Sequence, residues 1–309
     1  MIKIENSPIQ KINYLDFDIF IKRDDLLSTD FSGNKARKFL YFLDNGLCGI
    51  TKIVSFGSNQ SNAMYSLSVL CKDKNIDFEY YTDHIPKFLQ LNPVGNYKYA
   101  VDNGMKIYLF KTCKYSLLLN NRNLLSKTEK IGSTLFIPEG GRCETSRYGI
   151  NKLSQEIIEF KKNKKFKNLK IFLPSGTGTT ALYLQQCIND FKDNTQVFTV
   201  ACVGGERYLK KQFLMLEKDP SKHPKILSIK KYHFGKLNCE LYKFWIKLGK
   251  QTKIQFDLLY DPIGFKSMIE YLENNNYNND ENIIYIHQGG IQGNESMKLR
   301  YKRKCGENI

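Results

Sequence analysis

The sequence predicts an α/β protein in which parallel sheets are covered by helices. Apolar runs of strand length alternate with helical segments through most of the chain. Glycine, serine, threonine and asparagine stand at several of the junctions, where a chain has to turn. The chain has 309 residues, of which 41% are hydrophobic, so it can form the cores of two modest domains or one large domain.

The regular alternation begins near residue 52. An apolar run there passes through a small polar turn into a helical segment, which is the order of a βα unit. The predicted strands of the first half are 52–56, 77–81, 106–110 and 135–137, and the predicted helices are 61–72, 96–103 and 149–162.

The second half repeats this rhythm, with a polar surface loop at 273–281 and a basic helix or tail at 298–304. We expect two α/β domains, a large one of residues 1–47 and 139–309 and a small one of residues 48–138 inserted in it. The predicted strands are 170–173, 196–203, 226–231, 255–259 and 283–286, and the predicted helices are 180–188, 208–216, 239–248 and 267–273.

The cysteines predict a reducing environment. They form no CxxC pair and several lie in apolar runs, which favours buried, reduced thiols over a disulfide framework or a zinc site. The four histidines are also dispersed, so we expect no metal. The chain starts without a signal-peptide pattern and has no apolar run that could span a bilayer, which predicts a cytoplasmic protein with no membrane partner. The cysteines are Cys48, Cys71, Cys113, Cys143, Cys187, Cys202, Cys239 and Cys305.

The net charge of +16 raises nucleic acid as a partner. The lysines are spread over almost every segment, however, and lysine, asparagine and isoleucine are all abundant, which is typical of a compositional bias. We therefore expect no nucleic-acid partner, and we expect the positive field to attract anionic small molecules.

Lys35 stands in the most informative segment, Ser32–Lys38, where a Ser-Gly-Asn turn leads into an apolar-periodic helix. A lysine that forms an imine must lose its proton easily, and a poorly hydrated amine does so. The segment alone is also consistent with a solvated lysine in a first helical turn.

The turn at 174–180 is rich in glycine and threonine and lies between a predicted strand and a predicted helix. Free backbone N–H groups and threonine hydroxyls at such a turn bind phosphate. The pattern also fits a dinucleotide fingerprint, with Glu206 placed to hold a ribose, and a plain tight turn remains a further alternative.

Three further segments combine polar residues with turns. Ser61 and Asn62 follow a predicted strand and could bind a carboxylate or simply cap a helix. Tyr260 and Asp261 end another predicted strand, where they could move protons or pair with a ring nitrogen, or form an Asp-Pro turn. The segment 287–293 has three glycines that allow close approach to a ligand.

Taken together and in order, these segments resemble the family of 1-aminocyclopropane-1-carboxylate deaminase and D-cysteine desulfhydrase, which are pyridoxal-phosphate enzymes of the tryptophan-synthase-β-like fold (fold type II). The resemblance extends from near the start almost to the end of the chain. It is carried by Lys22-Arg23-Asp24-Asp25, Ser32-Gly33-Asn34-Lys35-Ala36-Arg37-Lys38, Gln60-Ser61-Asn62, Pro138-Glu139-Gly140-Gly141, Gly176-Thr177-Gly178-Thr179-Thr180, Tyr260-Asp261 and His287-Gln288-Gly289-Gly290-Ile291-Gln292-Gly293.

The resemblance implies a pyridoxal 5'-phosphate cofactor, a small amino-acid substrate and a homodimer. Lys35 is implied as the Schiff-base lysine, Lys38 as a neighbour of the phosphate, and Tyr260 as the catalytic tyrosine. Asp261 is implied as the partner of the pyridine nitrogen. The remaining implied roles are phosphate binding by Gly176, Thr177, Gly178, Thr179 and Thr180, contact of Asn62 with the phenolic oxygen, catalysis and carboxylate binding by Ser61, and substrate contact by Gln60 and Asn62.

The chain departs from the family pattern at three places. Ala63 follows Ser-Asn where the family often has Gln or His, Thr179 replaces a glycine, and Pro262–Phe265 intervene before Lys266. The loss of a polar contact at Ala63 favours β-elimination from D-cysteine, whereas an acid at position 261 is consistent with the cyclopropane deaminase. An NAD-dependent dehydrogenase, a basic nucleic-acid-binding protein and a family member that has lost activity remain alternatives.

Overall fold

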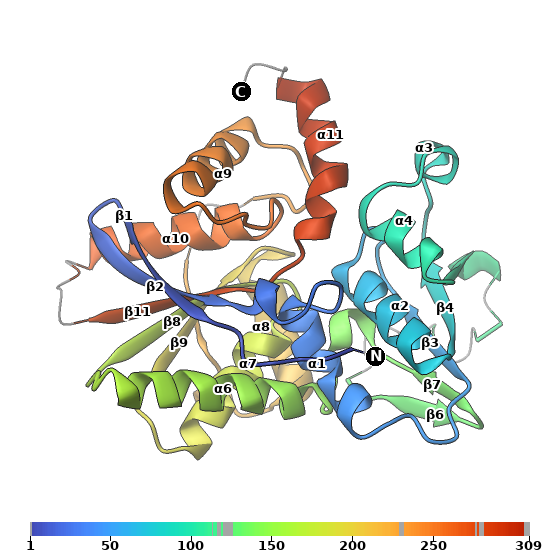
Figure 1. The fold of residues 1–309 in the computed structure, drawn as a ribbon, viewed down its shortest axis with the longest axis horizontal. Helices are drawn as coiled ribbons and strands as arrows, with labels where there is room; N and C mark the ends of the chain where they lie inside the picture. The colour runs from blue at the N-terminus through green and yellow to red at the C-terminus, as the bar shows by residue number, and fades with distance from the viewer. Residues whose placement is uncertain are drawn as a thin grey trace.

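The chain folds around two separate sheets, with helices packed around each of them (Figure 1). The computed structural model describes residues 2–112, 114–115, 119, 126–228, 232–275, 277 and 281–305. Apart from the first hairpin and one edge strand, neighbouring strands run parallel, so the predicted α/β class is confirmed. None of the helices in these residues is long and apolar enough to cross a membrane.

The larger sheet has the strand order β1-β2-β11-β8-β9-β10. Its central strands are almost wholly buried, as is usual for a parallel sheet covered on both faces. The strands are β1 (Ile9–Tyr14), β2 (Phe17–Arg23), β8 (Leu169–Ser175), β9 (Gln196–Ala201), β10 (Lys225–Ile226) and β11 (Asn282–His287).

The smaller sheet has the order β5-β4-β3-β7-β6. All of its strands come from residues 52–136, inside the segment 48–138 that we expect to form the inserted domain. The exact domain boundaries remain a prediction. The strands are β3 (Lys52–Phe56), β4 (Asp77–Thr82), β5 (Lys106–Leu109), β6 (Glu129–Ile131) and β7 (Thr134–Phe136).

Helices cover the sheets according to their apolar faces. Those on one side of the larger sheet bury residues such as Leu153 and Leu184, and those on the other side bury Leu248 and Met268. The helices are α1 (Gly33–Asp44), α2 (Asn62–Lys74), α3 (Lys87–Leu91), α4 (Gly95–Asp102), α6 (Ser146–Asn163), α7 (Thr179–Asp190), α8 (Gly205–Leu216), α9 (Cys239–Thr252), α10 (Asp261–Asn274) and α11 (Asn294–Cys305). Short 3-10 turns lie at 24–26, 110–112, 139–141, 220–222 and 291–293.

Several elements differ from the sequence-based expectation. The hairpin β1–β2, the edge strand β6 and the helix α3 were not expected. The predicted strand at 255–259 is wrong, because the segment forms no ladder and leads directly into α10. Asp257 explains this, since its Oδ1 accepts hydrogen bonds from the backbone N–H groups of Leu259 and Tyr260. Such a bonded turn replaces a strand ladder, and Pro262 is then well placed in the first turn of a helix.

Other boundaries shift less. Strand β10 covers only the start of the segment predicted at 226–231, and the last three residues of that segment lie outside the described part of the chain. Cys113 and most of residues 276–280, in the predicted surface loop, also lie outside it. The basic segment 298–304 forms the second half of α11, which packs against α9 and α4.

The expectation that all cysteines are reduced is wrong for one pair. Cys239, at the start of α9, forms a disulfide with Cys305, at the end of α11. The spacing of 66 residues gave no local signal for this pairing, which arises only because the fold brings the two helix ends together. Cys71, Cys143 and Cys187 are buried free thiols as expected, as is Cys202, while free Cys48 is exposed.

We expect Cys239→Ser to lower the free energy of unfolding under non-reducing conditions. The bond closes a loop of 66 residues, for which chain entropy gives a stabilisation of about 4 kcal/mol. Urea unfolding measures the difference, and Cys48→Ser, at an exposed free thiol, serves as the control. Equal stability of the two variants would show that the bridge adds nothing to the fold.

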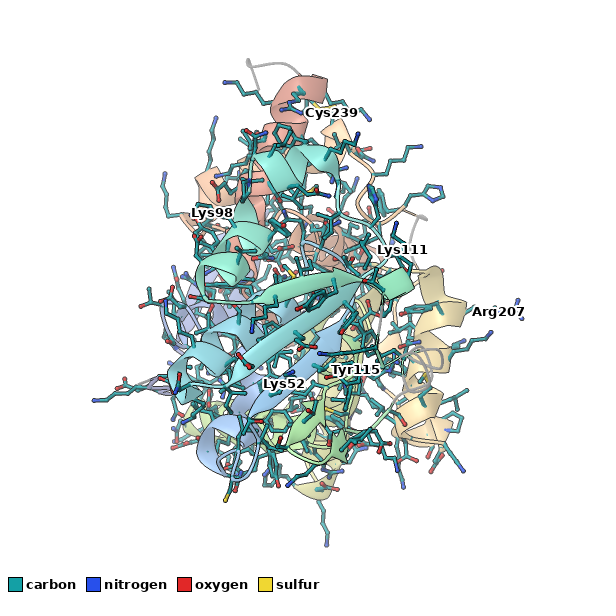
Figure 2. The ribbon with its side chains drawn as sticks, turned by 90° about the vertical axis from the view of Figure 1, so that its right-hand side faces the viewer. Lys52, Lys98, Lys111, Tyr115, Arg207 and Cys239 are labelled. Carbon is teal, nitrogen blue, oxygen red and sulfur yellow. A yellow bond between two sulfur atoms is a disulfide. The ribbon has the colours of Figure 1, made fainter. Side chains whose placement is uncertain are left out.

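The positive charge is distributed rather than concentrated. Figure 2 shows Lys52, Lys98, Lys111 and Arg207 well apart on one view of the molecule. Lys52 pairs with Glu79 at 2.8 Å, and Lys98 pairs with Asp102 at 2.5 Å. This arrangement favours a generally positive surface rather than a face built for nucleic acid.

Candidate active site

Helix α1 begins where the chain touches the loop after β11. Gly33 has φ +67°, and a Cβ there would lie 2.0 Å from the carbonyl oxygen of Gln288, so only glycine fits. The backbone N–H of Asn34 donates to that same carbonyl at 2.9 Å. The side-chain amide of Asn34 also donates to Oε1 of Gln288 at 2.9 Å. These contacts fix the start of α1 and therefore the position of Lys35 one residue later.

Two lysines of α1 share one acceptor. Nζ of Lys35 lies 3.1 Å and Nζ of Lys38 lies 3.0 Å from the carbonyl oxygen of Gly140. Burial lowers the pKa of Lys35 to about 8, an effect that the charge of Glu139 only partly offsets. Burial and then the charge of Lys35 lower the pKa of Lys38 well below its ordinary value. Lys35 is therefore an amine that becomes neutral, and nucleophilic, close to physiological pH.

This pKa predicts how Lys35 labels with an amine-selective reagent. At pH 7 about a tenth of the amine is neutral, so the rate should rise nearly tenfold between pH 6 and 7 and level off above pH 8. Peptide mass spectrometry of quenched samples measures the rate at Lys35. The same peptide in denatured protein is the control, whose rate should still rise above pH 9, as for an ordinary lysine. Identical profiles would contradict the lowered pKa.

The turn between β8 and α7 has the properties of an anion site. Gly178 has φ +73° and directly precedes α7, and a Cβ there would lie 2.4 Å from the ring of Phe213. The first backbone N–H groups of the helix have no intrahelical acceptor. Thr180 is only 4% exposed, yet its Oγ1 has no hydrogen-bond partner among the residues that the structure describes. A buried unpartnered hydroxyl at a helix start fits a bound phosphate, which would accept its hydrogen bond.

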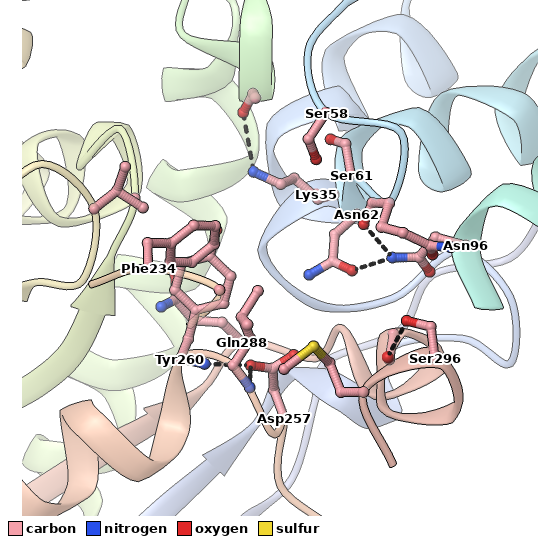
Figure 3. Close-up of a pocket in the computed structure, with 18 of the residues that line it drawn as sticks. Lys35, Ser58, Ser61, Asn62, Asn96, Phe234, Asp257, Tyr260, Gln288 and Ser296 are labelled. Carbon is pink, nitrogen blue, oxygen red and sulfur yellow. Dashed lines mark hydrogen bonds between the residues drawn. The ribbon is translucent and has the colours of Figure 1, made fainter. Parts of the chain in front are cut away.

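Asn62 is oriented by a neighbour that the sequence did not single out. Nδ2 of Asn96 donates to Oδ1 of Asn62 at 2.6 Å and to the carbonyl of Gln60 at 3.0 Å (Figure 3). The Nδ2 of Asn62 then lies beside Gly290, where a Cβ would approach it to 2.5 Å. Asn96 is 1% exposed, and within the described part of the chain its own Oδ1 has no hydrogen-bond partner. The Asn96 contact therefore fixes which end of the Asn62 amide acts as donor.

Ser61 and Gln60 both have structural partners. Ser61 caps α2, because its Oγ accepts from the N–H groups of Ala63 and Met64 at 3.2 and 3.5 Å. The capping alternative is therefore confirmed for Ser61. The side chain of Gln60 donates to Val94 at 2.9 Å. Both residues nevertheless line the same cavity as Lys35.

Asp261 lies in a buried carboxyl pair. Its Oδ1 accepts from the hydroxyl of Tyr285 at 2.7 Å, and its Oδ2 accepts from the N–H of Asp257 at 2.8 Å. Burial, followed by the charge of Asp257, raises the pKa of Asp261 well above its ordinary value. Burial also raises the pKa of Asp257 to about 7. His287, 3.5 Å from Asp261, has a pKa lowered by burial. The pair therefore retains a proton more readily than two exposed aspartates do.

One cavity of about 680 Å³ brings the predicted site residues together. Figure 3 shows Lys35, Tyr260 and Asn62 around it, supplied by segments far apart in the sequence. Glu206, the ribose-binding residue of the dinucleotide alternative, is instead exposed and pairs with Lys210 at 2.6 Å. The predicted residues that line the cavity are Lys35, Lys38, Gln60, Ser61, Asn62, Gly176, Thr177, Gly178, Thr179, Thr180, Tyr260 and Asp261.

Several lining residues were missed by sequence reasoning. Asp257 was hidden inside the wrongly predicted strand, although an acid in an apolar run is a usable signal. Asn96 gave no local signal, since only the fold brings it to the cavity. Neither did the residues of α11 that line its outer end.

Curated proteins match this sequence along most of its length. A protein of Pyrococcus horikoshii named "Putative 1-aminocyclopropane-1-carboxylate deaminase" is 24% identical over 293 residues, covering 89% of this chain and 85% of its own. A protein of the same name from Thermotoga maritima is 23% identical over 319 residues, covering 94% and 96%. No family model matches the sequence.

Solved structures share its fold. The structure of an ACC deaminase homologue gives a TM-score of 0.77 at 21% identity and covers 96% of this chain and 93% of its own. A hydrogen sulfide-producing enzyme from Fusobacterium nucleatum gives 0.66 at 17% identity, covering 93% and 94%. The chain therefore has the two-sheet, tryptophan-synthase-β-like fold of fold-type II pyridoxal-phosphate enzymes, and its predicted resemblance to the 1-aminocyclopropane-1-carboxylate deaminase family is confirmed along most of its length.

Proposed function

We propose that this chain is a pyridoxal-phosphate enzyme that removes the amino group of a small amino acid, with β-elimination from D-cysteine as its reaction. The observation that carries the proposal is the shared cavity of Lys35, whose pKa is about 8, and the β8–α7 turn with its unpartnered Thr180 hydroxyl. An amine for the aldehyde and a site for the phosphate are the two features that this cofactor requires.

The chain's own residues have distinct tasks in this proposal. The α7 N-terminus and Thr180 would bind the phosphate, and Asn62, held by Asn96, would donate to the phenolic oxygen. Asp261, whose carboxyl is fixed by Tyr285, would pair with the ring nitrogen. The cofactor, when bound, supplies an electron sink for negative charge that develops on the substrate's α-carbon.

Proton transfer falls to Lys35. Its neutral amine takes the proton from the α-carbon of D-cysteine, and the thiolate then leaves the β-carbon with the bonding electron pair. Ser61, which caps α2 and lines the cavity, would bind the substrate carboxylate together with the start of that helix. Overall, D-cysteine and one water yield pyruvate, ammonia and hydrogen sulfide. The name of the Fusobacterium structure, a hydrogen sulfide-producing enzyme, supports this reaction.

Deamination of 1-aminocyclopropane-1-carboxylate to 2-oxobutanoate and ammonia is the second candidate. It is favoured by the names of the curated relatives. That substrate has no α-proton, so the ring must open by another route, with protonation at a ring carbon. A carboxylate at Asp261 beside the cofactor's ring nitrogen would favour the protonated form of that nitrogen, which strengthens the electron sink.

Spectroscopy of the purified protein tests the cofactor. Addition of pyridoxal phosphate should give a near-visible absorbance band that borohydride removes, and peptide mapping should then find the reduced cofactor on Lys35. A protein that gains no band at any cofactor concentration is not an enzyme of this kind. Sulfide release from D-cysteine and from L-cysteine, compared with 2-oxobutanoate from the cyclopropane acid, then decides the reaction.

A further inference from the structure

The cavity continues well beyond the residues around Lys35. Its outer wall is formed by α11, through Ser296, Met297, Arg300 and Arg303, and by Phe88 of α3 across the opening. These α11 residues follow helical spacings of three and four, so they share one face. Figure 1 shows α11 beside α3 and α4 in the upper part of the molecule.

The two arginines bring positive charge to this outer end. The guanidinium of Arg303 lies over the ring of Phe88, 4.9 Å from its centre. Arg300 donates to the carbonyl oxygen of Gly235 at 3.0 Å and contacts Sδ of Met297 at 3.3 Å. Neither guanidinium has a carboxylate partner among the residues that the structure describes. Each therefore keeps donors for an anion, and a guanidinium binds a carboxylate through two parallel hydrogen bonds.

The position of α11 sets how far this charge lies from the inner site. Glu295 accepts from the backbone N–H of Gly95 at 3.2 Å, which docks the first turn of α11 on α4. Ser296 lies near the inner end, beside Asn96 in Figure 3. Arg300 and Arg303 are four and seven residues further along the helix, which corresponds to about 6 and 10 Å of axial rise. The wall between is apolar at Met297, which is 7% exposed.

We propose that Arg300 and Arg303 form a second anion subsite, and that the preferred substrates are β-thioether amino acids whose leaving group ends in a carboxylate. This inference rests on the proposed function and names its substrate class. The Cβ–S bond breaks, and the sulfur leaves with the electron pair and takes up a proton. One substrate molecule and one water give a thiol carboxylic acid, pyruvate and ammonia.

Matched substrates test the subsite. S-carboxymethyl-, S-(2-carboxyethyl)- and S-(3-carboxypropyl)-cysteine, as both enantiomers, are compared with their uncharged carboxamides, which have nearly the same shape. We expect kcat/KM to favour the acid over the amide by about tenfold at one preferred length, the scale of two partly exposed charge contacts. A preference for the amides, or no preference at any length, overturns the proposal.

Two double variants separate local contact from general attraction. R300Q/R303Q should remove the preference for the acid and leave turnover of the amides within about twofold. K298Q/K304Q removes the same charge from α11 at lysines that contact Trp245 and the carbonyl of Leu237, and it should keep the preference. Equal losses in both variants would show long-range attraction without a subsite, which overturns the proposal.

A binding measurement separates this inference from the proposed function. Calorimetric titration of the purified protein with each acid–amide pair needs no turnover. If the protein forms no cofactor band but still binds the acids more tightly, with loss in R300Q/R303Q, the subsite stands and the proposed reaction fails. If the band forms and D-cysteine is turned over without any acid preference, the proposed function stands and the subsite fails.

Discussion

Lys35→Ala should produce a protein that gains no borohydride-sensitive near-visible band with pyridoxal phosphate and has lost at least about a thousandfold in kcat/KM. The reason is geometric as well as chemical. Lys35 is presented by a helix start that Gly33 and Gln288 hold in place, and its lowered pKa allows the amine to become neutral near physiological pH. Absorbance titration with the cofactor and a coupled assay for 2-oxo acids measure the two losses.

Two control variants make this result specific. Lys35→Arg keeps a positive charge but cannot link to the aldehyde, so it should lose the band as completely as Lys35→Ala. Lys38→Met should keep the band, because Lys35 remains, while binding the cofactor more weakly through loss of a hydrogen-bond donor near the phosphate. The opposite pattern, a band lost in Lys38→Met and kept in Lys35→Ala, would assign the link to Lys38, which shares the same Gly140 carbonyl.

The parts of this site that the sequence predicts are those whose chemistry is local. A phosphate turn is made of consecutive residues, so Gly176 to Thr180 can be found from the sequence, as can a lysine at a helix start. The contact of Gly33 with Gln288 joins residues about 250 positions apart and could not be read from either segment. Both segments are nevertheless candidates in the sequence for other reasons, Ser32–Lys38 for its lysine and 287–293 for glycines that allow close approach to a ligand.

Side chains that act on other side chains were not predictable. Asn96 is important because it orients Asn62, and nothing in the sequence around a single asparagine in an amphipathic helix indicates that role. Asp257 lies in an apolar run whose pattern predicts a strand. The strand does not form, because the Asp257 carboxylate accepts hydrogen bonds from backbone N–H groups two and three residues further along the chain. The Cys239–Cys305 bridge likewise depends on where two helices end in space.

Glu156→Gln is expected to cost about 3–5 kcal/mol of unfolding free energy at pH 7. Glu156 accepts from Arg37 at 2.6 and 2.8 Å and from Lys22 at 2.5 Å, and all three side chains are nearly inaccessible to solvent. Asp24 is the second acid of the group and accepts from Arg37 at 2.9 Å. Removing one negative charge leaves two buried cations with a single acid, and a buried cation without its own acidic partner destabilises the folded state. Urea unfolding measures the loss.

Glu159→Gln, an exposed neutralisation on the same helix, is the matched control and should change stability by no more than about 0.5 kcal/mol. A cost below 1 kcal/mol for Glu156→Gln would mean that the cations find water or other acceptors.

The pH dependence of stability checks the same network. Although burial opposes its ionisation, the charge and hydrogen bonds of Arg37 hold the pKa of Asp24 below its ordinary value. A lowered folded-state pKa stabilises the fold above about pH 4 and ceases to do so as the pH falls through that lowered value. Arg37 stands between Lys35 and Lys38 on α1, so this network also anchors the helix that presents both amines. Glu156→Gln should therefore weaken cofactor binding as well as stability, although Glu156 lies outside the cavity lining.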